Sequence, residues 1–162
     1  MKSLRNLLFA LAGVAMLAGF KADNPTSKKY KCMIQMVNYT GEGAYIVISL
    51  INPKGAYEET LFVLGDDDEW YHEIDEWWKF FGAKKNSVDG ITGETIAGGE
   101  RSINVFEIDE SKINAGYKIR FETSVEDEGY HLKDVEIPYT TEALQAKADG
   151  SGFIRYVRFM PQ

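Results

Sequence analysis

Cysteine and histidine are scarce in this 162-residue chain, which has one Cys and two His. A single cysteine, Cys32, cannot form an intramolecular disulfide, so the fold must depend on a hydrophobic core, in which we expect Cys32 to be buried. His72 and His131 are far apart, and no second histidine follows His72 at the spacing that zinc hydrolases use. No serine stands in a nucleophile elbow. We therefore assign no metal ligand and no catalytic residue.

The chain also lacks an apolar run long enough for a membrane-spanning helix, which needs roughly 20 residues. Its longest run, residues 7–20, follows Lys2 and Arg5 and precedes polar residues, a pattern typical of a secretory signal peptide. An uncleaved N-terminal anchor is the alternative. No cysteine ends the run, so we expect no lipid anchor. The expected organisation is a signal peptide over residues 1–22, a linker over 23–29 and a single periplasmic or otherwise exported domain over 30–162.

Positive charge is the third shortage, with 18 Lys and Arg against 25 Asp and Glu and a formal net charge of −7. Cleavage after residue 22 would remove Lys2, Arg5 and Lys21 and no acid, so the formal charge would become −10. Such a surface disfavours nucleic acid and anionic membranes as partners, and we expect no stable membrane insertion after cleavage. It also disfavours capture of a free anion, an objection that weighs less against a covalently attached one.

What remains is patterned mainly for β structure. Residues 44–51 form a continuous apolar run, which predicts a strand buried on both faces, whereas 117–126 alternates and predicts one face in the core and one in water. About seven antiparallel strands fit an immunoglobulin-like β-sandwich. The expected strands are residues 30–39, 44–51, 57–64, 102–108, 117–126, 130–137 and 153–160.

One helix is expected between the third and fourth of these strands. Residues 66–69, Asp-Asp-Asp-Glu, offer a helix start, and Gly82 offers an end. The apolar residues at helical spacing are Trp70, Ile74, Trp77 and Phe81. We expect this aromatic face to pack against the sheet; the alternative is a wall for a planar ring. A second, short helix is expected over residues 141–148.

The segment after the helix, Val-Asp-Gly-Ile-Thr-Gly-Glu-Thr at residues 88–95, looks suited to binding chemistry. Positive φ angles at Gly90 and Gly93 would let backbone N–H groups and hydroxyls point at one bound group, such as a phosphate. The alternative is an ordinary turn between a helix and a strand, in which Asp89 makes a local hydrogen bond to the backbone.

This segment resembles the attachment motif of proteins modified by the bacterial FAD:protein FMN transferase. Asp89, Thr92, Gly93 and Thr95 match that motif in order and spacing. The resemblance implies that Thr95 accepts covalent FMN and that Asp89, Thr92 and Gly93 are read by the transferase. The motif has a small residue, usually Ala, where this chain has Glu94, which puts a carboxylate beside the acceptor hydroxyl.

A longer stretch, about residues 39–139, resembles an exported bacterial family, domain-of-unknown-function family 2271. The features that carry the resemblance are Ala44-Tyr45-Ile46-Val47, residues 60–64, Trp77-Trp78, residues 88–93 and Ala115-Gly116-Tyr117-Lys118. The C-terminal half is also similar to the immunoglobulin-like domain of flagellar hook-capping proteins.

The family resemblance implies a role in electron transfer outside the cytoplasm, because members are linked with membrane redox flavoproteins and with the FMN transferase. Those two proteins are the partners it implies. The rival hypothesis is a redox-inactive interaction module that docks by a strand edge or by its helix face, and Glu94 favours that hypothesis.

Overall fold

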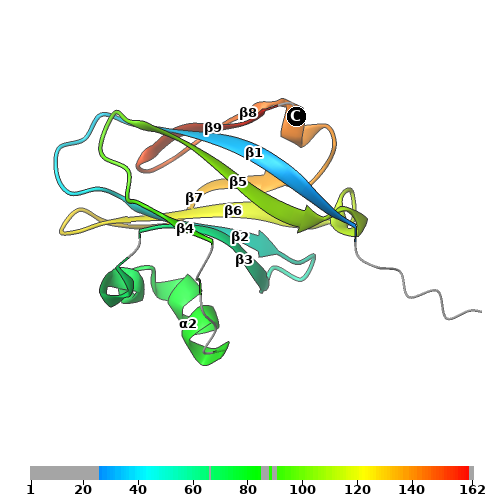
Figure 1. The fold of residues 1–162 in the computed structure, drawn as a ribbon, viewed down its shortest axis with the longest axis horizontal. Coiled ribbons are helices and arrows are strands. Elements are labelled where there is room, and N and C mark those ends of the chain that lie inside the picture. Colours follow the sequence, from blue (N-terminus) through cyan, green and yellow to red (C-terminus); the bar gives the residue numbers. More distant parts are fainter. Residues whose placement is uncertain (1–25, 66, 85–87, 89–90, 161–162) are drawn as a thin grey trace, which may run out of the picture.

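The computed structural model describes residues 26–65, 67–84, 88 and 91–160. Two sheets face each other in a β-sandwich, and a helix layer covers the outer side of one of them (Figure 1). The expected β-sandwich is therefore confirmed, while its immunoglobulin-like assignment stays a prediction.

The four-stranded sheet has the order β5-β1-β9-β8, and the five-stranded sheet has the order β4-β3-β2-β6-β7. All neighbouring strands are antiparallel except β3 and β4, which run parallel. The strands are β1 Ser27–Met36, β2 Tyr45–Ile51, β3 Tyr57–Leu64, β4 Thr92–Gly93, β5 Arg101–Asp109, β6 Lys118–Val125, β7 Gly129–Pro138, β8 Lys147–Asp149 and β9 Ile154–Met160.

The seven longer strands are the seven that the sequence predicts, with β3 correct to the residue. β1 begins at Ser27, inside the segment expected as a linker. The short β4 and β8 were not predicted. The helix expected over 141–148 is wrong: the 3₁₀ helix η4 (Ala143–Gln145) is a single turn, and Lys147 already belongs to β8. Another 3₁₀ helix, η3 (Glu110–Lys112), follows β5.

The main core lies between the two sheets and is built from the inward-facing residues of both. Cys32 is fully buried there, as expected, and burial raises the pKa of its thiol to about 12. The central strand β2 is buried along both faces, which confirms the prediction made from its continuous apolar run. A second apolar cluster, separate from this core, joins the five-stranded sheet to the helix layer.

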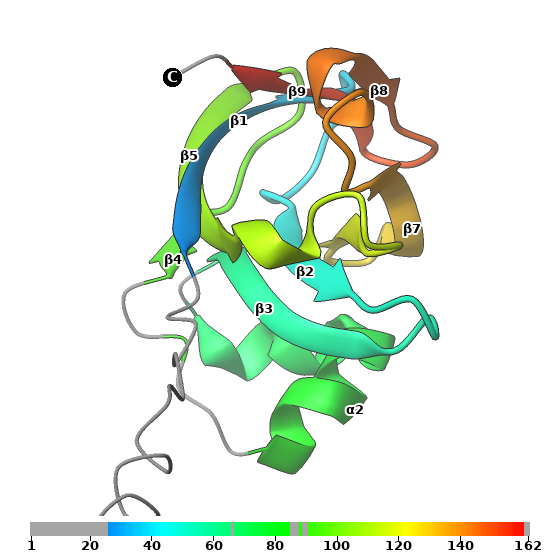
Figure 2. The ribbon, with the colours of Figure 1, turned by 90° about the vertical axis from the view of Figure 1, so that its right-hand side faces the viewer.

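The helix layer consists of a 3₁₀ helix, η2 (Asp68–Glu73), and an α-helix, α2 (Asp75–Lys84), both on the outer face of the five-stranded sheet (Figure 2). The single helix predicted from the periodicity is therefore wrong. Ile74 ends η2, because its N–H is bonded at 3.2 Å to the Tyr71 carbonyl, three residues back. Nor does Gly82 stop α2, which continues to Lys84.

The aromatic face of the helix layer packs against the sheet, as predicted. Trp77 is fully buried, and its ring stacks on that of Phe81 at a centroid distance of 4.7 Å. Its indole Nε1 donates a 2.9 Å hydrogen bond to Thr60 Oγ1 of β3. The neighbouring Trp78 remains 37% exposed.

The helix layer also explains why the prediction that one face of β6 is exposed to water is wrong. Its alternating sequence predicts one wet face, yet every residue from Ile119 to Val125 is buried. The polar face, which includes Arg120, Glu122 and Ser124, lies on the side of the sheet that the helix layer covers, so its charged groups must find partners inside the protein.

Candidate functional site

The segment that resembles the FMN attachment motif lies along one edge of the five-stranded sheet. Thr92 is opposite Val63 and Gly93 is opposite Leu64, in the two-residue strand β4. The Val63 N–H donates to the Ile91 carbonyl at 2.9 Å, and the Gly65 N–H donates to the Gly93 carbonyl at 2.6 Å. The segment is therefore held as an edge strand.

The Ile91 N–H donates to the Val88 carbonyl at 3.0 Å, so the segment begins with a turn as expected, but from Thr92 on it is a strand. Gly93 lies in β4 without the positive φ that the sequence analysis predicts, so that prediction is wrong. Asp89 and Gly90 lie outside the described residues. Thr92, Gly93 and Thr95 follow one another along the edge, but only Thr95 lines the small pocket at its end.

Thr95 is held in place by the residue after it. Ile96 is buried, and it exchanges two backbone hydrogen bonds with Ala44, of 2.8 and 3.2 Å. The Tyr39 hydroxyl also donates to the Ile96 carbonyl at 2.8 Å. These bonds fix the position of the Thr95 backbone beside the turn that precedes β2.

The Thr95 side chain is half-buried and rests against Gly43. A Cβ placed on Gly43 would stand 2.4 Å from Thr95 Oγ1, so the close approach requires glycine there. Within the described part of the chain, the hydroxyl makes no hydrogen bond. It is thus a positioned hydroxyl whose bonding capacity is unused.

The pocket beside Thr95 is small and acidic. Its volume is about 150 Å³, and its lining residues are Glu42, Gly43, Tyr45, Trp70, Glu73, Thr95 and Glu126. The exposed Glu94 adds a fourth carboxylate next to the hydroxyl. These charges oppose a phosphate anion, whose attachment would bring a like charge among them.

The fit of FMN to this pocket is therefore partial. The hydroxyl has the accessibility that a phosphoester acceptor needs, but the pocket is smaller than the roughly 300–1,000 Å³ of typical small-molecule sites and does not enclose an isoalloxazine ring. Glu94 was expected beside the acceptor from the sequence, whereas Glu42, Glu73 and Glu126 were not. Glu42 lies in a turn, Glu73 ends η2 and Glu126 directly follows β6, so only the fold brings them together.

A second polar cluster, which the sequence analysis also missed, lies under the helix layer. Glu122 of β6 is fully buried and accepts hydrogen bonds from the hydroxyls of Tyr57 at 2.6 Å and Tyr130 at 2.5 Å. Burial raises the pKa of Glu122 to about 7. It also raises the pKa of both tyrosines, which the hydrogen bonds to Glu122 raise further.

Arg120 completes this cluster. Its guanidinium lies 5.3 Å from the Tyr57 ring centroid and forms a 2.9 Å ion pair with Glu136 of β7. The Tyr57 ring also stacks with that of Phe80 of α2 at a centroid distance of 5.3 Å. Every polar group is satisfied by a neighbour, so the cluster ties β3, β6 and β7 to the helix layer and we assign it a structural role.

Two further kinds of site receive no support from the described residues. No three or more of their His, Cys, Asp and Glu side chains are grouped so that they could hold a metal ion. No helix formed by them has the length and hydrophobicity to cross a membrane.

Comparison with known proteins gives one match. The profile of a family described as "Predicted periplasmic protein (DUF2271)" matches residues 27–156, which include every strand but the end of β9. No curated protein matches the chain, and no solved structure does. The matched region is most of the sequence, and the family description agrees with the expected export. The chain therefore belongs to the DUF2271 family of predicted periplasmic proteins.

Proposed function

We propose that the protein works in an extracytoplasmic electron-transfer system and carries FMN as a phosphoester on Thr95. One observation supports this proposal most directly: the Thr95 hydroxyl is half-exposed, makes no hydrogen bond to described residues, and stands on a backbone held to the sheet by Ile96. An acceptor hydroxyl must be reachable, free of competing bonds and fixed in space, and Thr95 meets these three requirements.

The attachment would be a group transfer from FAD catalysed by the FMN transferase. Thr95 Oγ1 forms a bond to the phosphorus of the FMN half of FAD, the pyrophosphate bond breaks, AMP leaves, and the hydroxyl proton passes to a base. Bound FMN would supply the redox chemistry, exchanging electrons with a membrane flavoprotein. Covalent attachment suits an exported carrier, because a cofactor held only by affinity would be lost by diffusion.

A second candidate function is a redox-inactive interaction module, and the acidic lining of the pocket favours it. Glu42, Glu73 and Glu126 line the same pocket as Thr95, and Glu94 directly precedes Thr95 in the chain. A site evolved to hold a phosphate would normally place cations or backbone N–H groups there.

Mass spectrometry of the protein co-expressed with a cognate transferase separates the two functions. The carrier function predicts an added mass of FMN less one water, located on the peptide that contains Thr95. Thr95→Ala should abolish the addition. Thr92→Ala is the matched control, because it removes a neighbouring hydroxyl from the same edge and leaves the acceptor in place; it should lower the yield without moving the site.

Glu94→Ala decides between the remaining outcomes. If the wild type stays unmodified while Glu94→Ala gains FMN, the acidic site has lost its cofactor and the interaction module is the correct function. If neither protein is modified by an active transferase, the motif resemblance is accidental and the carrier function is wrong.

A further inference from the structure

β5 is the edge strand of the four-stranded sheet, and β1 is its only strand neighbour in the described part of the chain. The two strands pair continuously from Ser27 opposite Asp109 to Gln35 opposite Arg101, with no bulge. β5 is nine residues long and contains no proline. An edge of this length without a bulge exposes a row of backbone donors and acceptors that can pair with another strand.

The ladder between β1 and β5 shows which backbone groups are exposed. At one end the Met36 N–H donates to Glu100, and at the other the Glu110 N–H donates to Thr26, each at 3.0 Å. Since hydrogen-bonded pairs alternate along an antiparallel ladder, the even-numbered residues of β5 bond to β1. The backbone groups that face the open edge belong to Arg101, Ile103, Val105, Glu107 and, at the end of the strand, Asp109.

The side chains of the first four of these residues are all exposed on the outer face of the sheet, whereas that of Asp109 is half-buried. Ile103 and Val105 are each 50% exposed, which is unusual for large apolar residues of this protein. Read along the strand, the four side chains are positive, apolar, apolar and negative. In an antiparallel pair the second copy presents the reverse order, so each positive side chain would face a negative one and the apolar side chains would face each other.

We propose that two copies of the protein associate through their β5 edges as an antiparallel pair, in the register that places Ile103 opposite Val105 of the second copy. The same register places Arg101 opposite Glu107 at both ends. Opposite charges and apolar residues that face each other across strands stabilise a sheet. The product is one eight-stranded sheet that continues across both molecules.

Neighbouring registers are less complementary. With Val105 opposite its own copy, Ile103 would face Glu107; with Ile103 opposite its own copy, Arg101 would face Val105. A shift by a single residue would oppose inward-facing and outward-facing side chains. The charges and the apolar pair therefore select one register.

Asn104 provides independent support for this register. It is buried on the inner face of β5, and its Nδ2 has no hydrogen-bond partner among the residues that the structure describes, while its Oδ1 accepts from Ser102 at 3.3 Å. The proposed register puts Asn104 on the two-fold axis, opposite Asn104 of the second copy. That position is a non-hydrogen-bonded pair, in which the Cα atoms are only about 4.5 Å apart. A carboxamide both donates and accepts, so two copies can satisfy each other.

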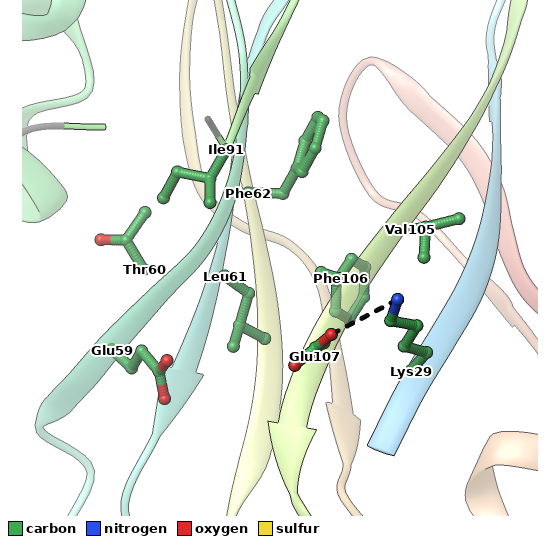
Figure 3. Close-up of a pocket in the computed structure, with 9 residues that line it drawn as sticks. All are labelled: Lys29, Glu59, Thr60, Leu61, Phe62, Ile91, Val105, Phe106 and Glu107. Carbon is green, nitrogen blue, oxygen red and sulfur yellow. Dashed lines mark ion pairs between the residues drawn. The ribbon is translucent and has the colours of Figure 1, made fainter. Parts of the chain in front are cut away.

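The surroundings of the edge are compatible with this pairing. A groove of about 380 Å³ lies beside it, with side chains from β3 and β5 along its walls (Figure 3). Arg101 and Glu107 are held on the outer face by neighbours in their own chain, Gln35 at 3.0 Å and Lys29 at 3.7 Å. Both partners belong to β1, on the side away from the open edge, so in the dimer Arg101 and Glu107 would turn from β1 toward the second copy while staying on the outer face.

Sedimentation equilibrium of the full-length expressed protein tests the association. The wild type should be a dimer that dissociates on dilution. Arg101→Glu and Glu107→Arg should each weaken the dimer by roughly tenfold or more, because both ends of the pairing then oppose like charges. Arg158→Glu is the matched control: it reverses an exposed charge on the same face, but in β9, away from the edge, and should leave dimerisation unchanged.

Mixing the two weakened variants gives the sharpest test. A copy with Glu at 101 and 107 and a copy with Arg at both positions are complementary at each end, so the mixture should form heterodimers with near wild-type affinity. A wild type that stays monomeric at high concentration overturns the proposal. So does a mixture that fails to associate, or an Arg158→Glu variant that weakens the dimer as much as the edge variants do.

Discussion

The carboxylate of Glu122 and the hydroxyl of Tyr130 lie 2.5 Å apart, beneath the helix layer. Glu122 occupies a position on β6 that a strand with one wet face would expose to water, yet its side chain has no contact with solvent. The tyrosine hydroxyls take the place of water, but they do not fully offset the cost of burying the charge.

The first prediction concerns the pH dependence of stability. The pKa of Glu122 is raised from 4.5 to about 7 in the folded protein, so between these values the folded state binds more protons than the unfolded state. Stability that is present below pH 4.5 should therefore be lost as the pH rises to about 7, by a total of about 3 kcal/mol at most.

Urea denaturation of the wild type and Glu122→Gln across pH 4.5 to 8 measures this effect. The free energy of unfolding of the wild type should fall relative to the variant as the pH rises, and the difference should level off above pH 7. Other groups that face Glu122, including Arg120 and Glu76, are shared by both proteins. Parallel pH profiles would show that Glu122 keeps an ordinary pKa.

The second prediction concerns two adjacent tryptophans. Trp77→Ala should lower the free energy of unfolding by about 3–5 kcal/mol, the usual cost of truncating a buried large aromatic. Trp78→Ala, the matched control on the next residue, should cost clearly less, about 1–2 kcal/mol, because 37% of the Trp78 side chain stays exposed. Equal losses in chemical denaturation would mean that Trp77 does not anchor the helix layer to β3.

The third prediction concerns Asp134 of β7, which is buried and organises the loop before β9. Its carboxylate accepts backbone hydrogen bonds from Ser151, Gly152 and Ile154 at 2.8–3.0 Å and one from the Thr123 hydroxyl at 2.7 Å. Asp134→Asn replaces an acceptor oxygen by a donor that faces N–H or O–H groups. It should cost roughly 2 kcal/mol or more in thermal or chemical denaturation.

Asp149→Asn is the control for that measurement. It makes the same chemical change on the exposed β8, where Asp149 forms only a solvated ion pair with Lys147, and it should alter stability by less than about 1 kcal/mol. A loss as large as that of Asp134→Asn would assign the effect to net charge rather than to the buried hydrogen bonds.

The fourth prediction concerns the reactivity of Cys32. Burial raises its thiol pKa to about 12, and the side chain has no exposed surface, so almost no thiolate is present or reachable at neutral pH. A chromogenic disulfide reagent should modify no thiol in the native protein and one thiol per chain in denaturant. Rapid native reaction would place Cys32 outside the core.

The strands were predictable because their patterns are local. The apolar run of β2 and the turns on either side of β3 define strands whatever else surrounds them. The burial of the polar face of β6 could not be predicted, because it depends on the helix layer, which is distant from β6 in the sequence. The predicted helix breaks at Ile74, whose N–H bonds to the Tyr71 carbonyl three residues back, and the apolar spacing gives no sign of this 3₁₀ turn.

In the candidate site, too, local features could be predicted from the sequence and contacts between distant segments could not. The order of Thr92, Gly93 and Thr95 is visible in the sequence, and their motif resemblance rests on that order alone. The pairing of β4 with β3 and the convergence of Glu42, Glu73 and Glu126 on Thr95 depend on contacts between distant segments. Gly43 gave no local signal, since its role is set by a side chain 52 positions later.

The two-residue pairing of β4 with β3 bears on when Thr95 could be modified. In the folded chain, the carbonyls of Ile91 and Gly93 accept hydrogen bonds from Val63 of β3 and from Gly65 just after it, and Ile96 is bonded to Ala44. An enzyme that reads this segment by pairing with its backbone would have to act before the sheet closes, in competition with folding after export. One that reads only the projecting hydroxyl would act afterwards. Rapid closure of this edge would therefore limit the yield of modification for the first kind of enzyme and promote it for the second.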